Sequence, residues 1–471
     1  MFALRARLLD AWDHIRSSYW FIPSLMAVVS ATLAVTLVAV DNRVGAGWMQ
    51  DIPFLTGNRP EGARAFLSTI AGSMIGVAGV TFSITIASVV YATGQYGPRL
   101  LANFMDDRGN QITLGTFIST FLYCILILRT VRSANEEAGV GEGFVPHISI
   151  AVALALALAS LGVFIYFIHH IPESIHVSNL VAGIGRDLRK QLDTLFPERI
   201  GEAETTRDAQ ADDSARTSVP DRFFEEAVRI AADSAGYVRG VDSERLLHLA
   251  AEHDLLLRVR RRPGDFVADG DTLALAWPPG RVVDDVLEDT RLAFAWGAQR
   301  TARQDTRFLV NELVEIAARA LSPGVNDPFT AISCLDWLSA ALKALATRDF
   351  PEPIRHDEDG TLRVIAEPTT FDEFVDAVYG QLRPYLVADR NAALHGLLTI
   401  GEVAGWVTDP SQARALRVQA DALLQGATDV LKVDADRDAV VKRHREVVRL
   451  LLGRVDYETA AAQTDWIGGS A

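Results

Sequence analysis

Four long runs of apolar residues lie within the first 170 positions, whereas the rest of the chain mixes apolar and polar positions over shorter distances. A helix that crosses a membrane needs about 20 mostly apolar residues, because the hydrocarbon core is about 30 Å thick. Each run is long enough, so we predict membrane spans at residues 21–40, 66–91, 112–128 and 145–168. Asp10 and Asp13 precede the first run, which argues against a cleaved signal peptide.

The second and third runs carry small and hydroxyl-bearing residues on single helical faces. One face of the second run gathers Gly72, Gly76, Gly79 and Ser83, and its GxxxG spacing allows another helix to approach closely. One face of the third run gathers Thr113, Thr116, Thr120 and Tyr123. Hydroxyl groups in lipid need hydrogen-bond partners, so we expect this face to pack against the second run. Both faces are candidate helix-packing or pore-lining surfaces, and the plainly apolar first and fourth runs are expected to face lipid.

Charge divides the chain into two parts. Residues 1–170 contain ten arginines, no lysine and ten acidic residues, so this part is neutral. The formal net charge of −15 therefore falls entirely on residues 171–471. An acidic part of this kind argues against a nucleic-acid partner, whose phosphates require clustered Lys and Arg. The arginines and lysines near the predicted helix ends favour both termini in the cytoplasm.

The region after the fourth run is predicted to be mainly helical. We expect a juxtamembrane helix at 171–199, a disordered linker at 200–220, a small β/α module at 221–281, a helical domain at 282–456 and a flexible tail at 457–471. Ser243 is the expected N-cap of a helix in the module. The fold class is thus an α-helical polytopic membrane domain with four transmembrane helices, followed by a mainly helical α+β cytoplasmic region with a small β module.

The most distinctive polar pattern of this region lies between Arg300 and Thr330. Asp327 is suited to cap a helix and Pro328 to occupy its first position, which predicts a corner between two helices. A functional interpretation stays open beside this structural one. It is a polar site or subunit contact formed by Arg300, Gln304, Asp305, Ser322, Asn326, Asp327 and Thr330.

A weak candidate for a metal site follows the fourth run. His169, Glu173 and His176 would share a face if the helix continued, and imidazole and carboxylate groups bind several divalent ions. Pro172 interrupts the hydrogen-bond ladder there, so we favour an interfacial helix junction and expect no metal or cofactor. Neither of the two cysteines has a CxxC partner, which argues against a zinc site.

Five phrases stand out along the chain. They are TFSIT-x-x-S from Thr81, QYGPRLL from Gln95, LGTFISTFLY from Leu114, FIHHIPESIH from Phe167 and ALSPGVNDPFTA from Ala320. Together they resemble a bacterial family of predicted membrane proteins known only as domain of unknown function 2254, and the resemblance covers nearly the whole chain. It implies an inner-membrane location and the plan of four helices, and it implies no activity.

Three classes of function can be weighed on these features. The polar faces of the second and third runs favour an oligomeric channel or pore-like protein in contact with membrane lipid. The size of the remaining region favours instead a membrane-anchored sensor or assembly module with an unidentified cytoplasmic partner. An enzyme is disfavoured, because the chain has no HExxH, no GxSxG, no Walker loop and no GxGxxG in a strand–helix context. We therefore expect a homo-oligomeric membrane protein without catalytic residues.

Overall fold

The chain forms two compact units, residues 1–179 (unit 1) and residues 180–471 (unit 2). The structure is a computed structural model that describes residues 18–44, 60–97, 107–132, 144–196, 219–455 and 457–461. Most of the predicted linker and residues 462–471 of the predicted tail lie outside the described residues. The first five residues of that tail form a short helix, α19 (Tyr457–Ala461).

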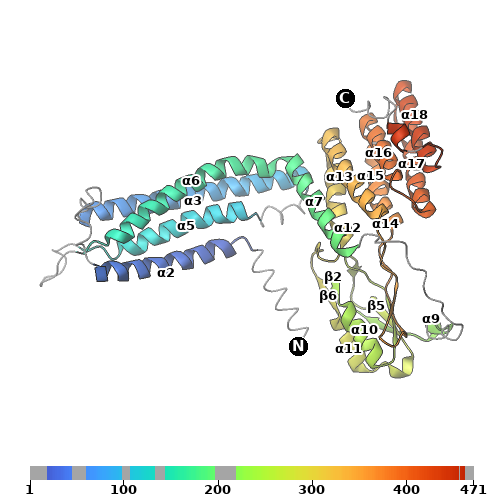
Figure 1. The fold of residues 1–471 in the computed structure, drawn as a ribbon, viewed down its shortest axis with the longest axis horizontal. Coiled ribbons are helices and arrows are strands. Elements are labelled where there is room, and N and C mark those ends of the chain that lie inside the picture. The colour runs from blue at the N-terminus through green and yellow to red at the C-terminus, as the bar shows by residue number, and fades with distance from the viewer. Residues whose placement is uncertain are drawn as a thin grey trace. The chain divides into compact units, whose positions relative to one another are not determined.

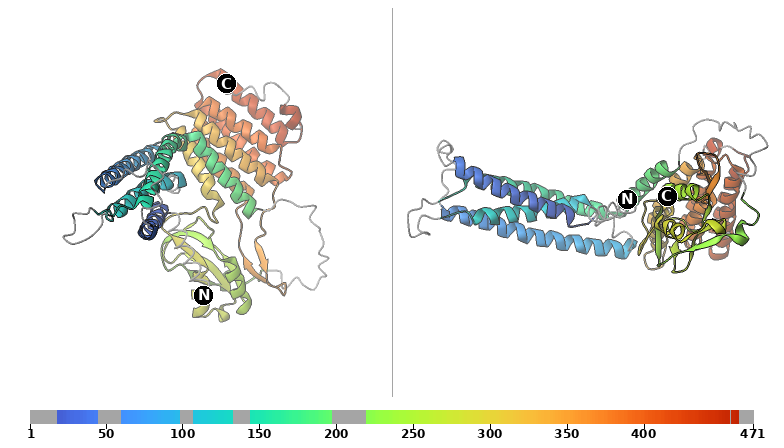
Figure 2. Two further views of the ribbon diagram at one scale, coloured as in Figure 1. Left: turned by 60° about the vertical axis from the view of Figure 1, so that its left-hand side comes forward. Right: turned by 90° about the horizontal axis from the view of Figure 1, so that it is seen from below.

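The described part of unit 1 contains four long helices. They are α2 (Phe21–Val44), α3 (Pro60–Tyr96), α5 (Arg108–Leu128) and α6 (His147–Ile175). The first three include the predicted spans 21–40, 66–91 and 112–128, and α6 begins two residues after the start of the predicted span 145–168. Figures 1 and 2 show them side by side, and α5 packs against the other three. All four are long and apolar enough to cross a membrane. The helix α13 (Pro328–Ala346) of unit 2 also meets that criterion. Length and composition therefore give five candidate spans among the described residues, where the sequence pattern predicted four.

The core of unit 1 forms where α5 meets its neighbours. A Cβ at Gly115 of α5 would lie 3.2 Å from the Cα of Pro23, so the backbones of α2 and α5 approach closely at this point. Nearby, the hydroxyl of Ser30 donates to the carbonyl of Ser119 at 2.6 Å. Further apolar side chains are fully buried between the four helices, among them Ala34, Leu67, Ile127 and Ala153.

Unit 2 contains a β module built from two sheets. One sheet has the strand order β1-β5-β3-β8-β7 and the other has the order β4-β2-β6. All pairings are antiparallel except that of β3 with β8. The strands are β1 (Val228–Ala231), β2 (Gly236–Val241), β3 (Leu256–Val259), β4 (Phe266–Val267), β5 (Thr272–Trp277), β6 (Phe294–Gly297), β7 (Ile354–His356) and β8 (Leu362–Ile365).

The β module is larger than the sequence predicted. Strands β6, β7 and β8 lie in the region assigned to the helical domain. A short strand beside a turn at Asp359-Gly360 was expected there, but nothing in so short a segment indicates that it pairs with the β module. Both sheets share one apolar core with α10 (Ser243–Glu252) and α11 (Asp284–Leu292). The N-cap of α10 is Asp242 rather than Ser243, since the Asp242 carboxylate accepts from the backbone N–H of Arg245 at 3.0 Å.

The remainder of unit 2 is helical. It comprises α7 (Val177–Leu195), α9 (Phe223–Glu226), α12 (Thr306–Ala320), α13, α14 (Phe371–Val375), a π-helical segment (Asp376–Gly380), α15 (Gln381–Leu386), α16 (Arg390–Ala404), α17 (Pro410–Val430) and α18 (Asp434–Leu451). Aspartates cap several of these helices, and Asp-Pro pairs begin both α13 and α17. The predicted cap at Asp327 is confirmed, because its carboxylate accepts from the N–H of Thr330 at 3.1 Å.

Candidate functional site

The hydroxyl face of α5 is used inside unit 1. The Thr120 hydroxyl lies 3.1 Å from the Ser160 hydroxyl of α6, and the Tyr123 hydroxyl donates to the Ser149 carbonyl of α6 at 3.0 Å. Thr113 and Thr116 donate to carbonyls of their own helix, as their positions four residues after Gly109 and Ile112 allow. Helix α5 does pack against α3, as expected, but the hydrogen-bond partners of its two inner hydroxyls lie on α6. Their partners are the serines of α6, a helix whose Ala/Leu-rich sequence reads as uniformly apolar.

A buried carboxylate that the sequence pattern missed ties α2 to α6. Asp41 accepts hydrogen bonds from the backbone N–H groups of Ile148 and Ser149 at 2.9 and 3.0 Å, and from the Ser149 hydroxyl at 2.6 Å. These are free N–H groups of the first turn of α6, which also carries the positive end of the helix dipole. The signal in the sequence was a single acidic residue directly after an apolar run.

The glycine face of α3 is open. A Cβ placed at Gly72, Gly76 or Gly79 would meet no atom within 4 Å, and Ser83 is exposed on the same side. An open groove of about 610 Å³ runs along this face and is lined by Ile75, Gly76, Gly79, Val80, Ser83, Ile84 and Ala87. The opposite side of the helix is buried through Thr81 and Thr85, among others. Helix α3 therefore has one packed side, which includes Thr81 and Thr85, and one unpacked side, which carries the glycines.

The weak metal candidates do not converge. The His169 imidazole lies 3.4 Å from the Glu173 carboxylate, both side chains are exposed, and His176 is the C-cap of α6. No group of three potential metal ligands occurs within the described parts of the chain. The neighbouring His170 has a partner on another helix. Its imidazole contacts the Asp107 carboxylate at 2.8 Å, and Asp107 is the N-cap of α5.

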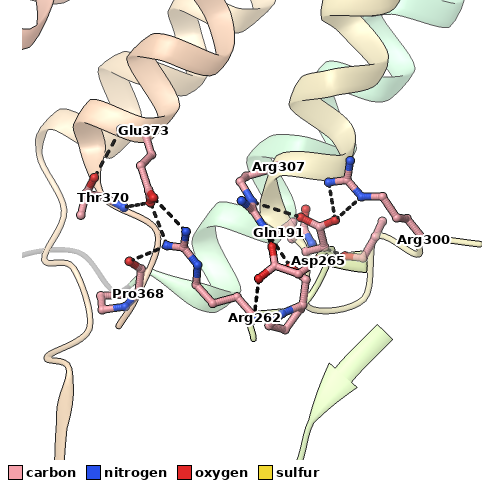
Figure 3. Close-up of polar contacts among 11 residues, drawn as sticks. Gln191, Arg262, Asp265, Arg300, Arg307, Pro368, Thr370 and Glu373 are labelled. Atoms are coloured by element: carbon pink, nitrogen blue, oxygen red, sulfur yellow. Dashed lines mark hydrogen bonds and ion pairs between the residues drawn. The ribbon is translucent and has the colours of Figure 1, made fainter. Parts of the chain in front are cut away.

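A charged junction connects the β module with the helices of unit 2 (Figure 3). Its members, three arginines and three carboxylates, are Arg262, Asp265, Arg300, Asp305, Arg307 and Glu373. Arg262 donates to both carboxylate oxygens of Glu373 on α14, at 2.8 and 2.9 Å, and this pairing lowers the pKa of Glu373. Arg307 of α12 donates to Asp265 at 3.0 Å. The turn between β3 and β4 is therefore held by two helices of the helical part.

Asp305 is the buried centre of this junction. Its side chain is 1% exposed, and Arg300 donates to its Oδ2 through Nε at 2.8 Å and Nη2 at 2.5 Å. Its Oδ1 is buried without a hydrogen bond in the described structure, although Arg307 Nε lies 3.8 Å away. Burial raises the pKa of Asp305, and the two arginines oppose this effect. Gly264 has φ +93°, and a Cβ there would lie 2.5 Å from the Asp305 Cγ, so the turn requires glycine at this position.

Two further contacts extend the junction. Gln304 accepts from the backbone N–H of Val241 in β2 at 2.8 Å, and Gln191 of α7 donates to the carbonyl of Ala302. Helix α7 is thereby attached to the loop that carries Arg300 and Asp305. The sequence pattern pointed to Arg300, Gln304 and Asp305. It did not point to the other members of the junction, and the RRPGD turn that contains Arg262 and Asp265 was the only signal near any of them.

The second half of the predicted polar site lies elsewhere. We call residues 321–329 the corner; they join α12 to α13 and include the first two residues of α13. Ser322 donates to the Arg319 carbonyl at 2.6 Å, Asn326 has φ +51°, and Thr330 donates its hydroxyl to Asp327 at 2.6 Å. The 15 residues of α12 separate the corner from Asp305 by about 22 Å at 1.5 Å per residue. The structure therefore divides the seven predicted residues into two sites.

Comparisons with known proteins agree with the membrane character of unit 1. A family described as "Predicted membrane protein (DUF2254)" matches residues 16–401. Uncharacterized proteins of Mycobacterium bovis and Mycobacterium tuberculosis are each 29% identical to this chain over 433 residues, which cover 91% of this chain and 80% of each relative. No solved structure matches the chain.

Proposed function

The chain belongs to the predicted membrane protein family DUF2254, and from that premise we propose that it forms a homo-oligomeric, pore-like channel in the bacterial inner membrane. In this proposal both termini lie in the cytoplasm, unit 2 regulates the pore, and no catalysis is required. The proposal is supported chiefly by one observation, the unpacked glycine face of α3.

Those glycines have an energetic cost without a benefit inside the chain. Glycine in a helix interior is about 1 kcal/mol less favourable than alanine, so Gly72, Gly76 and Gly79 together cost about 3 kcal/mol. A Cβ at any of them would clash with nothing. Membrane helices associate through small residues that let backbones approach closely. The association of α3 with α3 of another copy would offset the cost.

The same face narrows the choice of pore-lining surface. The inner hydroxyls of α5 bind α6, which favours α3 over α5 as the lining. On α3 the exposed hydroxyl of Ser83 donates to the carbonyl of Gly79 at 2.9 Å, and its oxygen keeps lone pairs that can accept hydrogen bonds from water. A ring of such faces would line a polar path, whereas each remaining helix would face lipid or protein.

A leucine scan with an internal control tests the proposal. Gly79→Leu fills the groove, and Gly162→Leu adds the same side chain to α6, where a Cβ also meets nothing within 4 Å. We expect the wild type and Gly162→Leu to purify as oligomers in nanodiscs and to conduct ions in planar bilayers. Gly79→Leu should reduce both the subunit count and the conductance. A monomeric wild type, or bilayers silent across several salts and tensions, would contradict the channel.

A second candidate function is a membrane-anchored sensor or assembly module, and it is favoured by the way α7 enters unit 2. Helix α7 begins one residue after the C-cap of α6 and is tied by Gln191 to the loop of the charged junction. A partner or ligand that moves the junction could therefore act on the membrane helices. Crosslinking and affinity purification of the full-length protein from native membranes test this candidate. A stoichiometric partner that is lost in Arg262→Glu supports it, and the absence of any partner contradicts it.

A further inference from the structure

A pocket of about 450 Å³ lies in the helical part of unit 2, where α16, α17 and α18 pack against one another (Figure 1). Its walls are the C-terminal end of α16 with the loop after it, the first turns of α17 and the C-terminal end of α18. The volume falls within the range of about 300–1,000 Å³ that is typical of small-molecule sites. All of its lining residues belong to unit 2, so its geometry does not depend on unit 1.

One part of the lining is apolar. Leu452, the C-cap of α18, is 50% exposed and faces this pocket rather than the core. An apolar ligand that covers such side chains removes them from water, which favours binding. The apolar lining consists of Ala404, Val407, Ala413, Leu450, Leu451 and Leu452.

Two arginines on successive turns of α17 form the charged part of the lining. Arg414 is exposed and makes no hydrogen bond or ion pair with any described residue. Arg417 donates from Nε to both carboxylate oxygens of Asp421, at 3.1 and 3.0 Å, and its Nη groups donate to no acceptor in the described structure. Guanidinium groups bind carboxylates through paired N–H donors. The two like charges lie three residues apart on one helix, so an anion beside both would relieve their repulsion.

The lining also contains the carboxylate of Asp409. This side chain is the N-cap of α17 and accepts from the backbone N–H of Ser411 at 2.8 Å, so the positive end of the helix dipole offsets its charge. Residues 439–454, which include the C-terminal end of α18, contain five basic residues and one acidic residue, in a region whose net charge is −15. Clustered basic residues of this kind attract anions.

We propose that this pocket binds a small amphiphilic carboxylate. Its charged group lies beside Arg414 and Arg417, and its apolar body lies against the leucines at the end of α18. An inorganic anion would leave most of the volume unfilled, and an uncharged ligand would not use the two guanidinium groups. The carboxylate of Asp409 in the lining favours a singly charged ligand over a dianionic phosphate ester. The inference concerns unit 2 and is independent of pore activity.

Isothermal titration calorimetry on the full-length protein in nanodiscs tests the proposal, with empty nanodiscs as the blank. The probes are octanoate, octanamide, which has a similar apolar body without the charge, and acetate, which has the charge without the body. We expect octanoate to bind saturably, with one molecule per chain. Its affinity should be about tenfold or more above that of either other probe, because each of them lacks one of the two contacts.

Two variants and a matched control assign the binding to this pocket. Arg414→Gln should weaken octanoate binding about five- to tenfold and leave octanamide binding unchanged. Leu452→Ser should weaken the binding of both. Arg445→Gln is the control, because Arg445 is an exposed arginine of α18 that does not line the pocket. All three positions are exposed, so we expect thermal unfolding close to that of the wild type.

Four outcomes would overturn the inference. Octanoate heats equal to those of the blank mean that the pocket takes no such ligand. Equal affinities for octanoate and octanamide mean that the arginines do not select an anion, and equal affinities for octanoate and acetate mean that the apolar lining is not used. Equal losses in Arg414→Gln and Arg445→Gln mean that the attraction is diffuse. Channel recordings on the same samples separate this result from the proposed function, because a silent bilayer contradicts the channel and leaves the titration unaffected.

Discussion

Substituting Gly264 by alanine should destabilise the attachment of the β module far more than a glycine-to-alanine change in an equivalent turn. Gly264 has φ +93°, and a side chain in such a conformation costs about 1–2 kcal/mol. The added Cβ would also lie 2.5 Å from the Asp305 Cγ, so the carboxylate must move away from Arg300. Hydrogen bonds to charged groups are worth about 1.5–3 kcal/mol, which brings the expected loss to about 3–5 kcal/mol.

Gly270 provides the matched control for this prediction. It has φ +81°, but a Cβ there meets no atom within 4 Å, so Gly270→Ala should cost only the backbone strain of about 1–2 kcal/mol. A third variant, Asp305→Ala, removes the group with which the new Cβ collides. In that background Gly264→Ala should cost no more than Gly270→Ala, which gives a coupling energy of about 2–3 kcal/mol between positions 264 and 305.

Hydrogen exchange measured by mass spectrometry on the full-length protein in nanodiscs gives the required local free energies. Peptides that cover β2, β4 and the start of α12 report the opening of the junction. The reasoning is refuted if Gly264→Ala and Gly270→Ala have equal effects, or if the effect of Gly264→Ala is unchanged without the Asp305 carboxylate.

Three further predictions concern other contacts. Asp41→Ala should lower the stability of unit 1 by about 2–3 kcal/mol, because it leaves the first N–H groups of α6 without their acceptor. Asp41→Asn should lower the stability less, and thermal unfolding in detergent measures both variants. The raised pKa of Asp305 means that the folded state binds its proton more tightly than the unfolded state does. The stability of the wild type relative to Asp305→Asn should therefore be greatest at or below about pH 4 and should fall as the pH rises through the folded-state pKa of Asp305. Urea unfolding midpoints at several pH values measure this difference. A difference that grows with rising pH would contradict the effect of burial on Asp305. Arg348→Leu should release the C-terminal end of α7, with faster hydrogen exchange at residues 188–196 and unchanged exchange in α17; unchanged exchange in α7 would show that its apolar face alone holds it.

The features that the sequence predicted well are those determined by local physics. Bilayer thickness requires long apolar runs, so the four helices of unit 1 could be read from composition. A capping aspartate and the proline after it act only on residues within the first turn of the helix that they begin. The start of α13 was therefore predictable from Asp327 and Pro328. The open glycine face of α3 followed from helical periodicity alone, although the sequence does not show which side of a helix is packed.

The features that were missed depend on contacts between distant parts of the chain. Arg262 and Glu373 are 111 residues apart, and the residues next to each of them give no indication that the two side chains pair. The hydroxyl of Ser160, which meets Thr120 of α5, stands alone in an Ala/Leu-rich run, where a single hydroxyl does not change the hydropathy pattern. Strand β8 is buried through its parallel pairing with β3, more than 100 residues earlier, and its own four residues carry no period from which this pairing could be inferred.

The pairing of β3 with β8 makes helices α12 and α13 an insertion within the β module. A ribosome must synthesise residues as far as Ile365 before the five-stranded sheet can close, and until then the edge of β3 carries unpaired backbone groups. Ending the chain after β6 would leave that edge exposed permanently. The β module therefore cannot be excised as a continuous segment, and a fragment meant to isolate it must either retain both helices or replace them with a linker that returns the chain from Gly297 to Ile354.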